Sequence, residues 1–233
     1  MSKSKKQTKA NQSGSSFFWI VLIVAVCLLA LIIVLSKISS PSEKDTNATF
    51  DYSNQPFEGD KDAPVKIVEF GDYKCPICKQ FNESVYPVIQ KEFVDTGKVQ
   101  FYFMNFPFIN TDSTRSAEFA ETVYKELGND VYWKFHHLLY NKLPDDQKYE
   151  RMDYFTTDFL KKTLAEVSSD KDVKKVEAAF NNKDYKEALD KDKSYVNKLG
   201  IDATPALFID GKKFEGSSFN EFIDEIKKAV DKK

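Results

Sequence analysis

Two cysteines separated by two residues are the part of this sequence with the clearest chemistry. Cys75 and Cys78 lie in the segment FGDYKCPIC, where a strand-like run gives way to an amphipathic stretch. On a helix, this spacing brings both sulfur atoms to one face of the first turn. A thiolate there meets free backbone N–H groups and the positive end of the helix dipole, which lower its pKa. The pair therefore has the properties of a reactive disulfide.

Zinc binding and inert packing are the alternatives for these two thiols. A structural zinc site usually has four ligands, and the one other cysteine of the chain, Cys27, lies in an apolar run. The two histidines, His136 and His137, are adjacent to each other in a distant segment. A secreted scaffold held by disulfides would carry several cysteine pairs. The spacing and its strand–helix context favour redox chemistry, and we expect no bound metal.

The amino-terminal residues indicate where the chain is located. Residues 17–35 are 19 consecutive residues without a charge, and at ~1.5 Å per residue a helix of that length nearly spans a hydrocarbon core of ~30 Å. Lysines and no acids precede the run, so the positive-inside rule places the amino terminus in the cytoplasm. A cleaved signal peptide is the alternative, but the run is longer than a usual signal core and no A-x-A site follows.

We therefore predict a cytoplasmic basic tail over residues 1–16, an uncleaved transmembrane anchor over 17–36 and a linker over 37–60. The linker region is rich in Ser, Asn, Asp and Thr and contains Pro41 and Pro56. The protein would thus be held in the cell membrane, with the rest of the chain outside the cytoplasm, where disulfides persist. The net charge of the whole chain is −2 and its charges are interspersed, which gives no indication of a nucleic-acid partner.

Residues 61–233 have the length of one domain, and their periodicity predicts its elements. The run 65–70 predicts a strand, and the run 99–104 predicts a second, buried strand. Between them, residues 75–94 predict a helix that Pro87 should kink. Asp210-Gly211 indicates a hairpin turn after the strand 206–209. Residues 219–230 predict a final amphipathic helix. Between residues 108 and 205 the signals are almost all helical. They include a helix closed by Gly128 and another, from Tyr185 to Leu199, closed by Gly200.

The order strand, helix, strand, helical region, hairpin, helix predicts an α/β domain with a thioredoxin-like fold. A large helical domain would be inserted over about residues 110–200. The many aromatic residues are most simply explained as core. They include Phe101, Phe103, Phe106 and Trp133. His136 is expected to pack or form a hydrogen bond within the insert rather than to bind metal.

Three separated motifs resemble those of the DsbA-like thiol-disulfide oxidoreductases. They are VEFGDYKCPIC at residues 68–78, YWKFH at 132–136 and ATPALF at 203–208. The resemblance extends from about residue 60 to the carboxyl terminus. With the predicted anchor, the chain is most similar to the membrane-anchored BdbD type of Gram-positive bacteria. It departs from the pattern at Pro76-Ile77, where DsbA has Pro-His and the BdbD type has Pro-Ser. Ile77 therefore offers no cation to the thiolate, and the reduction potential should be less extreme than that of DsbA.

The resemblance assigns roles to two residues far from the cysteines. It implies a cis peptide bond between Thr204 and Pro205, beside the cysteines, with the backbone of Thr204 available to pair with an extended substrate segment. A turn proline before a strand is the alternative from the local sequence alone.

The family also places an acid beneath the disulfide, at the position of Glu69. A buried carboxyl group near Cys78 would have a raised pKa and could exchange a proton with that thiol. A glutamate at the end of a strand, facing water, is the alternative.

The resemblance implies an oxidase that donates the Cys75–Cys78 disulfide to reduced, unfolded exported proteins. A DsbB-like, quinone-linked membrane oxidoreductase would then reoxidise it. No flavin or nicotinamide motif is present, so the redox-active disulfide is the only redox group that we expect. An isomerase is disfavoured because no dimerisation domain is visible, and we expect a monomer. A tethered reductant for exported thiols and a non-enzymatic holdase, in which the cysteines are incidental, remain as alternatives.

Overall fold

The computed structural model describes residues 19–20, 22–24 and 47–233. The chain divides into two compact units, Met1–Asp45 and Thr46–Lys233. In the described residues, no helix has both the length and the apolarity needed to cross a membrane. The predicted anchor over 17–36 lies mostly outside the described residues, as do the predicted basic tail over 1–16 and the linker up to residue 46. These predictions therefore stay predictions.

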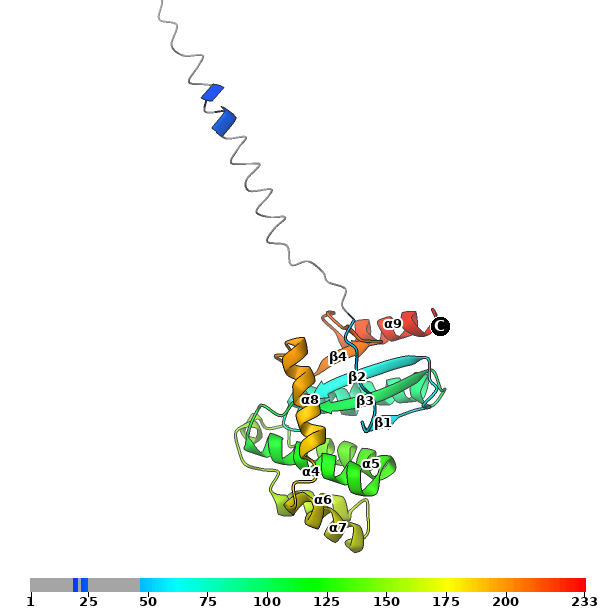
Figure 1. Ribbon diagram of the computed structural model, residues 1–233, viewed down its shortest axis with the longest axis vertical. Coiled ribbons are helices and arrows are strands. Elements are labelled where there is room, and N and C mark those ends of the chain that lie inside the picture. Colours follow the sequence, from blue (N-terminus) through cyan, green and yellow to red (C-terminus); the bar gives the residue numbers. More distant parts are fainter. Residues whose placement is uncertain (1–18, 21, 25–46) are drawn as a thin grey trace, which may run out of the picture. The chain divides into compact units, whose positions relative to one another are not determined.

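Residues 47–233 form a five-stranded mixed sheet in the order β1-β3-β2-β4-β5 (Figure 1). Its strands are β1 (Phe57–Glu58), β2 (Val65–Gly71), β3 (Val99–Asn105), β4 (Ala206–Ile209) and β5 (Lys212–Lys213). β2 runs parallel to β3 and antiparallel to β4, so it is paired on both sides. The predicted strands and the hairpin at Asp210-Gly211 are confirmed, and both turn residues have positive φ angles.

A long helical segment follows β2 and begins at the cysteines. It consists of α2 (Pro76–Gln80), a π-helical turn (Phe81–Val85), α3 (Tyr86–Ile89) and a second π-helical turn (Gln90–Val94). Pro87 lies at the beginning of α3, where its missing N–H group cannot donate to the preceding turn. The irregularity predicted at this proline is therefore present as a change between α-helical and π-helical turns.

The remaining helices agree with the predicted helical insert and the final helix. They are α4 (Thr111–Leu127), α5 (Asn129–Asn141), a 3-10 turn (Gln147–Glu150), α6 (Thr157–Ala165), α7 (Asp170–Asn181), α8 (Lys186–Leu199) and α9 (Phe219–Val230). α8 ends at Gly200 in the left-handed conformation, φ 61°, as its position predicts. The thioredoxin-like sheet with a helical insertion between β3 and β4 is thus confirmed.

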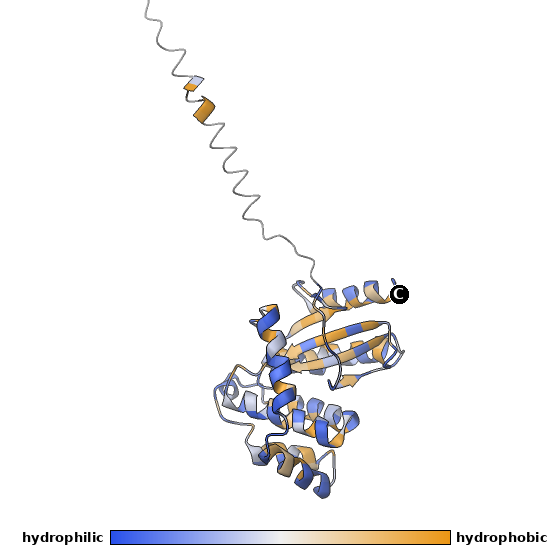
Figure 2. Cartoon of the chain, in the orientation of Figure 1, coloured by the Kyte–Doolittle hydropathy of each residue, from blue (hydrophilic) through white to orange (hydrophobic). Residues whose placement is uncertain are grey.

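Side chains that alternate along the strands separate two faces of the sheet. The first face carries Ile67, Phe101 and Phe103 and packs in the larger core with α2, α3, α5 and α9. The second face carries Val68 and Phe70 and packs with α8 and the segment around residue 50. Figure 2 shows the strands mainly in apolar colours between helices of mixed polarity. Because β2 alternates, Glu69 and Gly71 lie on the first face, the one that α2 covers.

The domain begins before residue 61, unlike the predicted boundary of the linker. Phe50 is buried and its ring lies 5.4 Å from that of Phe208 and 6.0 Å from that of Phe70. Tyr52 packs in the same cluster, and β1 pairs with β3. Residues 47–60 therefore belong to the domain. Isolated aromatic residues in a polar segment show no periodicity, and their burial depends on the sheet face that they cover.

A buried polar cluster connects the carboxyl end of β3 to the insert. Asp192 of α8 accepts hydrogen bonds from the Asn105 backbone N–H (2.7 Å) and from Gln55 Nε2 (3.0 Å). Glu121 of α4 accepts a bond from Asn105 Nδ2 at 2.6 Å. Burial raises the pKa of Asp192 to about 6 and also raises the pKa of Glu121. The cluster links one end of β3 to α4, α8 and the segment before β1.

A buried ion pair fixes the loop between β2 and the cysteines. Lys74 Nζ lies 2.8 Å from Asp112 Oδ2, and neither side chain is exposed. Lys74 also donates to the Met152 carbonyl, at 2.8 Å, and Asp112 accepts the backbone N–H groups of Tyr154 and Phe155. The pair therefore joins the residue before Cys75 to two parts of the insert.

We expect Lys74→Met to lower the free energy of unfolding by about 3–5 kcal/mol, because it leaves the Asp112 carboxylate buried without its cation. The measurement is urea unfolding followed by circular dichroism. Lys186→Met is the matched control, since Lys186 pairs with Asp190 on the surface and such pairs contribute roughly 0–1 kcal/mol. Equal losses in the two variants would contradict this reading of the buried pair.

Candidate active site around Cys75 and Cys78

Cys75 occupies the position directly before α2. Its backbone is extended, with φ −79° and ψ 119°, and its Sγ accepts a hydrogen bond from the Cys78 backbone N–H at 3.4 Å. The Cys75 N–H in turn donates to the Asp72 carbonyl at 2.9 Å. Pro76 lies in the first turn of α2, where a missing N–H group has no cost. The predicted placement of the CxxC pair at a helix start is therefore present.

The two thiols have opposite electrostatic surroundings. Hydrogen bonding to the Cys78 side chain, followed by Thr204 and the N–H groups of Cys78 and Ile77, lowers the pKa of Cys75 to about 6 against the effect of burial. Cys78 is fully buried, and burial followed by its interaction with Cys75 raises its pKa well above the usual value. At neutral pH, Cys75 is therefore the thiolate and Cys78 the thiol.

Glu69 lies in the interior beneath the cysteines rather than in water. It is 3% exposed, and its Oε1 has no hydrogen-bond partner among the described residues. Burial, and then the charge of Cys75, raise the pKa of Glu69 well above its ordinary value. A carboxyl group in this position keeps its proton to a higher pH than an exposed one, so it can act as a proton donor to a nearby thiolate.

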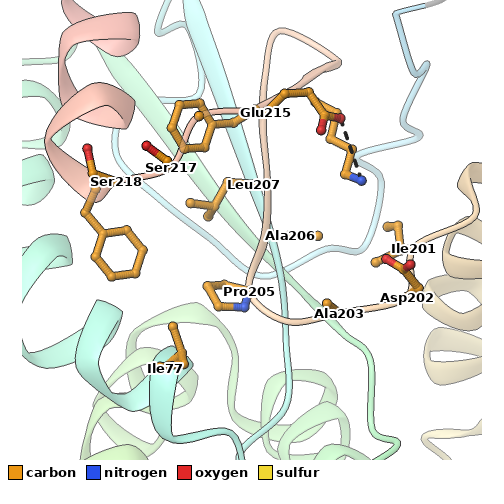
Figure 3. A pocket seen from close by; sticks show the side chains of 14 residues that line it. Ile77, Ile201, Asp202, Ala203, Pro205, Ala206, Leu207, Glu215, Ser217 and Ser218 are labelled. Atoms are coloured by element: carbon orange, nitrogen blue, oxygen red, sulfur yellow. Dashed lines mark ion pairs between the residues drawn. The ribbon is translucent and has the colours of Figure 1, made fainter.

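The Thr204–Pro205 peptide bond is cis, as the resemblance implies. The Cys75 thiol is 3.5 Å from the Thr204 carbonyl oxygen, and residues 203–205 come directly before β4. A hollow of about 420 Å³ adjoins them, lined by Ile77, Pro205, Leu207 and Phe219 among others. Figure 3 shows Ile77 on one side of Pro205 and Leu207 on the other. The structure thus brings the predicted residues Cys75, Thr204 and Pro205 together at one surface.

Three buried residues at this site were not among the predicted ones. The Tyr73 hydroxyl lies 3.0 Å from His136 Nδ1, and the Tyr140 ring lies 5.0 Å from that of Tyr73. His136 therefore contacts the segment before the cysteines rather than only the insert. The spacing of Tyr132, His136 and Tyr140, four residues apart each time, places them on one face of α5. That spacing was available from the sequence, but which strand the face covers was not.

In residues 47–233, no three His, Cys, Asp or Glu side chains converge as metal ligands would. The expectation of a site without metal stays a prediction, and Cys75 and Cys78 are both free thiols in this structure.

Comparisons with known proteins agree with this fold and site. A family model described as thioredoxin matches residues 52–232. The probable disulfide bond formation protein D of Bacillus cereus is 37% identical over 213 residues, which cover 91% of this chain and 94% of the relative. Disulfide bond formation protein D of Bacillus subtilis is 36% identical over 178 residues, 76% of each protein. The crystal structure of oxidised BdbD from Bacillus subtilis has a TM-score of 0.72 at 33% identity and covers 79% of this chain and 97% of that one.

The fold and the paired cysteines define a thioredoxin-like thiol-disulfide oxidoreductase. Within that class, the chain belongs to the family of the disulfide bond formation proteins D. The resemblance found in the three motifs is thereby confirmed.

Cys75 should react with iodoacetamide with a midpoint near pH 6, because its thiolate persists to that pH, whereas an unperturbed thiol has a midpoint near about 8.5. The measurement is the rate of alkylation of the reduced protein as a function of pH, with the Cys75 peptide followed by mass spectrometry. Buried Cys78 is the internal control and should stay unmodified until the protein unfolds. A midpoint near 8.5, or faster alkylation of Cys78, would show that the assignment of the two thiols is wrong.

Proposed function

We propose that this protein is an extracytoplasmic oxidase that donates the Cys75–Cys78 disulfide to newly exported proteins. The observation that carries the proposal is the placement of Cys75 directly before α2, where its Sγ accepts the Cys78 N–H, above a fully buried Cys78. This placement shifts the pKa values of the two thiols in opposite directions. A dithiol whose outer sulfur is a stable thiolate is a weak reductant, so the corresponding disulfide is a strong oxidant. The names of its relatives support formation of disulfides as the direction of the reaction.

The reaction begins when a substrate thiolate attacks Cys75 Sγ. The Cys75–Cys78 bond breaks, a mixed disulfide forms between Cys75 and the substrate, and Cys78 Sγ leaves with the electron pair. Because its pKa is high, Cys78 takes up a proton, which protonated Glu69 can supply. A second substrate thiolate then attacks the substrate sulfur of the mixed disulfide. The substrate leaves oxidised and Cys75 departs as a stable thiolate, so two electrons remain on the enzyme.

The surface beside Cys75 suits an extended polypeptide as substrate. Residues 203–205 precede the paired part of β4, so the backbone of Thr204 can pair with a substrate segment in the manner of an added strand. Ile77 is 48% exposed and adjoins the hollow next to Pro205. It therefore offers an apolar contact to a side chain of an unfolded substrate.

Reoxidation completes the proposed cycle. The two electrons left on Cys75 and Cys78 have to pass to a partner, for which we propose a DsbB-like, quinone-linked membrane oxidoreductase. The predicted anchor over residues 17–36 would hold both proteins in the same membrane, with the catalytic domain of this chain outside the cell membrane. We propose that the chain acts as a monomer, with the disulfide as its only redox group.

The oxidised protein should convert a reduced, unfolded test protein to its disulfide form, and Cys75→Ser should abolish this activity because the attacked sulfur is lost. Cys78→Ser should also abolish it, because a protein with Cys75 alone has no Cys75–Cys78 disulfide to donate. Thiol trapping and gel electrophoresis measure both outcomes. Oxidation by Cys75→Ser at the parent rate would refute the proposal, and full biological activity without both cysteines would favour the holdase.

The reduction potential of the pair separates an oxidase from a tethered reductant. Equilibration with glutathione or dithiothreitol should give a value closer to the about −120 mV of DsbA than to the about −270 mV of thioredoxin. A value near that of thioredoxin would assign the protein to the reductants.

The full-length protein should pellet with membranes, because residues 17–36 would form an anchor, and a protease added to intact protoplasts should digest residues 61–233. Deletion of residues 17–36 is the matched variant and should leave the protein out of the membrane fraction. A full-length protein in the soluble fraction, or a domain protected from the external protease, would contradict the proposed location.

A further inference from the structure

A layer of buried polar rings lies between the first face of the sheet and α5. It consists of Tyr73, Tyr132, His136 and Tyr140, none of which is more than 2% exposed. We call these four residues the buried tyrosine layer. None of them takes part in the exchange steps described above, although the layer lies under the segment that leads to the cysteines.

Tyr140 is the member of this layer whose pKa is raised, after burial, by both Cys78 and Glu69. Its hydroxyl lies 3.0 Å from the position that a Cβ atom on Gly71 would occupy. Glu69 and Gly71 are two residues apart on β2, so their side-chain positions lie on the same face. Phe103, the register partner of Glu69, has its ring 6.3 Å from the ring of Tyr140. The Tyr140 hydroxyl therefore reaches the part of the interior that contains Glu69.

The Tyr140 hydroxyl and one oxygen of the Glu69 carboxyl group lack a hydrogen-bond partner in the dithiol state. Tyr140 OH, Tyr132 OH and Glu69 Oε1 are all buried without a hydrogen bond among the described residues. After burial, the groups that raise the pKa of Tyr132 are Tyr73 and Glu121, whereas those that raise the pKa of Tyr140 are Cys78 and Glu69. An unpaired buried polar group is costly, and in a native structure it requires an explanation. A role in a state other than the dithiol is such an explanation.

Lysines next to the cysteines are engaged elsewhere. Lys74 pairs with Asp112, and Lys79 donates to the Leu143 carbonyl at 2.7 Å and contacts Asp145. Burial, with His137 nearby, lowers the pKa of His136 well below its usual value, so that this ring is neutral. The ionisable groups that interact with Glu69 through their charges are Cys75, Cys78, Tyr73, Tyr86 and Tyr140. The Tyr86 hydroxyl is bonded to Glu58. The group that can stabilise a negative charge on Glu69 is therefore an O–H donor, the hydroxyl of a tyrosine.

We propose that Tyr140 is a positioning residue for the proton that moves between Glu69 and Cys78, its hydroxyl donating a hydrogen bond to the Glu69 carboxylate that this transfer leaves. When the disulfide is attacked, the proton passes from the Glu69 carboxyl to Cys78 Sγ, and the hydroxyl then stabilises the Glu69 carboxylate. Tyr140 keeps its own proton throughout, because burial and the charge of Cys78 raise its pKa well above the usual value. This inference rests on the proposed role of Glu69 in the exchange reaction.

The test is the rate at which a reduced peptide attacks the Cys75–Cys78 disulfide of the full-length protein between pH 5 and pH 9. Tyr140→Phe should slow the reaction about tenfold at pH 7, as expected for one hydrogen bond to a charged group. The midpoint of the pH–rate profile that belongs to Glu69 is the one that Glu69→Gln should abolish. Tyr140→Phe should move this midpoint to a higher pH, because the Glu69 carboxylate loses its hydrogen-bond donor. Tyr132→Phe is the matched control, with the same deletion on the same helix, and should leave the rate and the midpoint unchanged.

A double variant separates this role from a structural one. In the Glu69→Gln background, Tyr140→Phe should have little further effect on the rate, whereas a packing defect would persist. If Tyr140→Phe does not fold, 3-fluorotyrosine at position 140 serves instead; as a stronger donor of the same shape, it should accelerate the reaction.

The inference would be overturned if Tyr140→Phe reacts at the parent rate, or if fluorotyrosine brings no gain in rate. It would also be overturned if Tyr140→Phe slows Glu69→Gln as much as it slows the parent protein. None of these results would affect the proposed function, which is tested separately by Cys75→Ser and by the reduction potential of the pair.

Discussion

The chemistry of this protein depends on holding two thiols of one helical turn in opposite electrostatic environments. Cys75 lies before the first turn of α2, where hydrogen bonds from the Cys78 thiol and from backbone N–H groups stabilise its thiolate. Cys78 is turned inward, and burial disfavours its charged form. If both sulfur atoms were equally exposed, neither would be the preferred site of attack. The helix start supplies the difference, and the covered face of the sheet preserves it.

The difference between the environments of Cys75 and Cys78 is maintained by β2 and by the helical insert. Pairing on both sides fixes β2, so its alternation places Glu69 under the cysteines and Val68 on the opposite face. The Lys74–Asp112 pair connects the residue before Cys75 to α4, and the segment at 152–155 binds the same two side chains. α5 then places the ring of Tyr140 beside Gly71 and Phe103, on the same face as the acid. The helical insert is therefore part of the wall of the active site as well as an addition to the thioredoxin-like sheet.

Local patterns predicted what depends on local interactions. The buried runs of β2 and β3, the helix ending at Gly200 and the hairpin at Asp210-Gly211 were all readable from the sequence. Phe50 and the Lys74–Asp112 pair were not, because their burial depends on which segments meet in three dimensions, and β1 is only two residues long. Glu69 became a candidate through the resemblance, while Tyr140 needed the position of α5 over Gly71. The anchor over 17–36 rests on hydropathy alone.

Ile77 shows how one position between the cysteines can serve contact rather than charge. A cationic side chain there would stabilise the Cys75 thiolate directly, and isoleucine cannot do so. The low pKa of Cys75 arises instead from hydrogen bonds that involve Cys78, Thr204 and the backbone, and these do not depend on the identity of residue 77. The exposed side chain of Ile77 is therefore left to line the hollow beside Pro205. In this chain, substrate contact and thiolate stabilisation fall to different groups, so a change at residue 77 can alter the first while the hydrogen bonds retain the second.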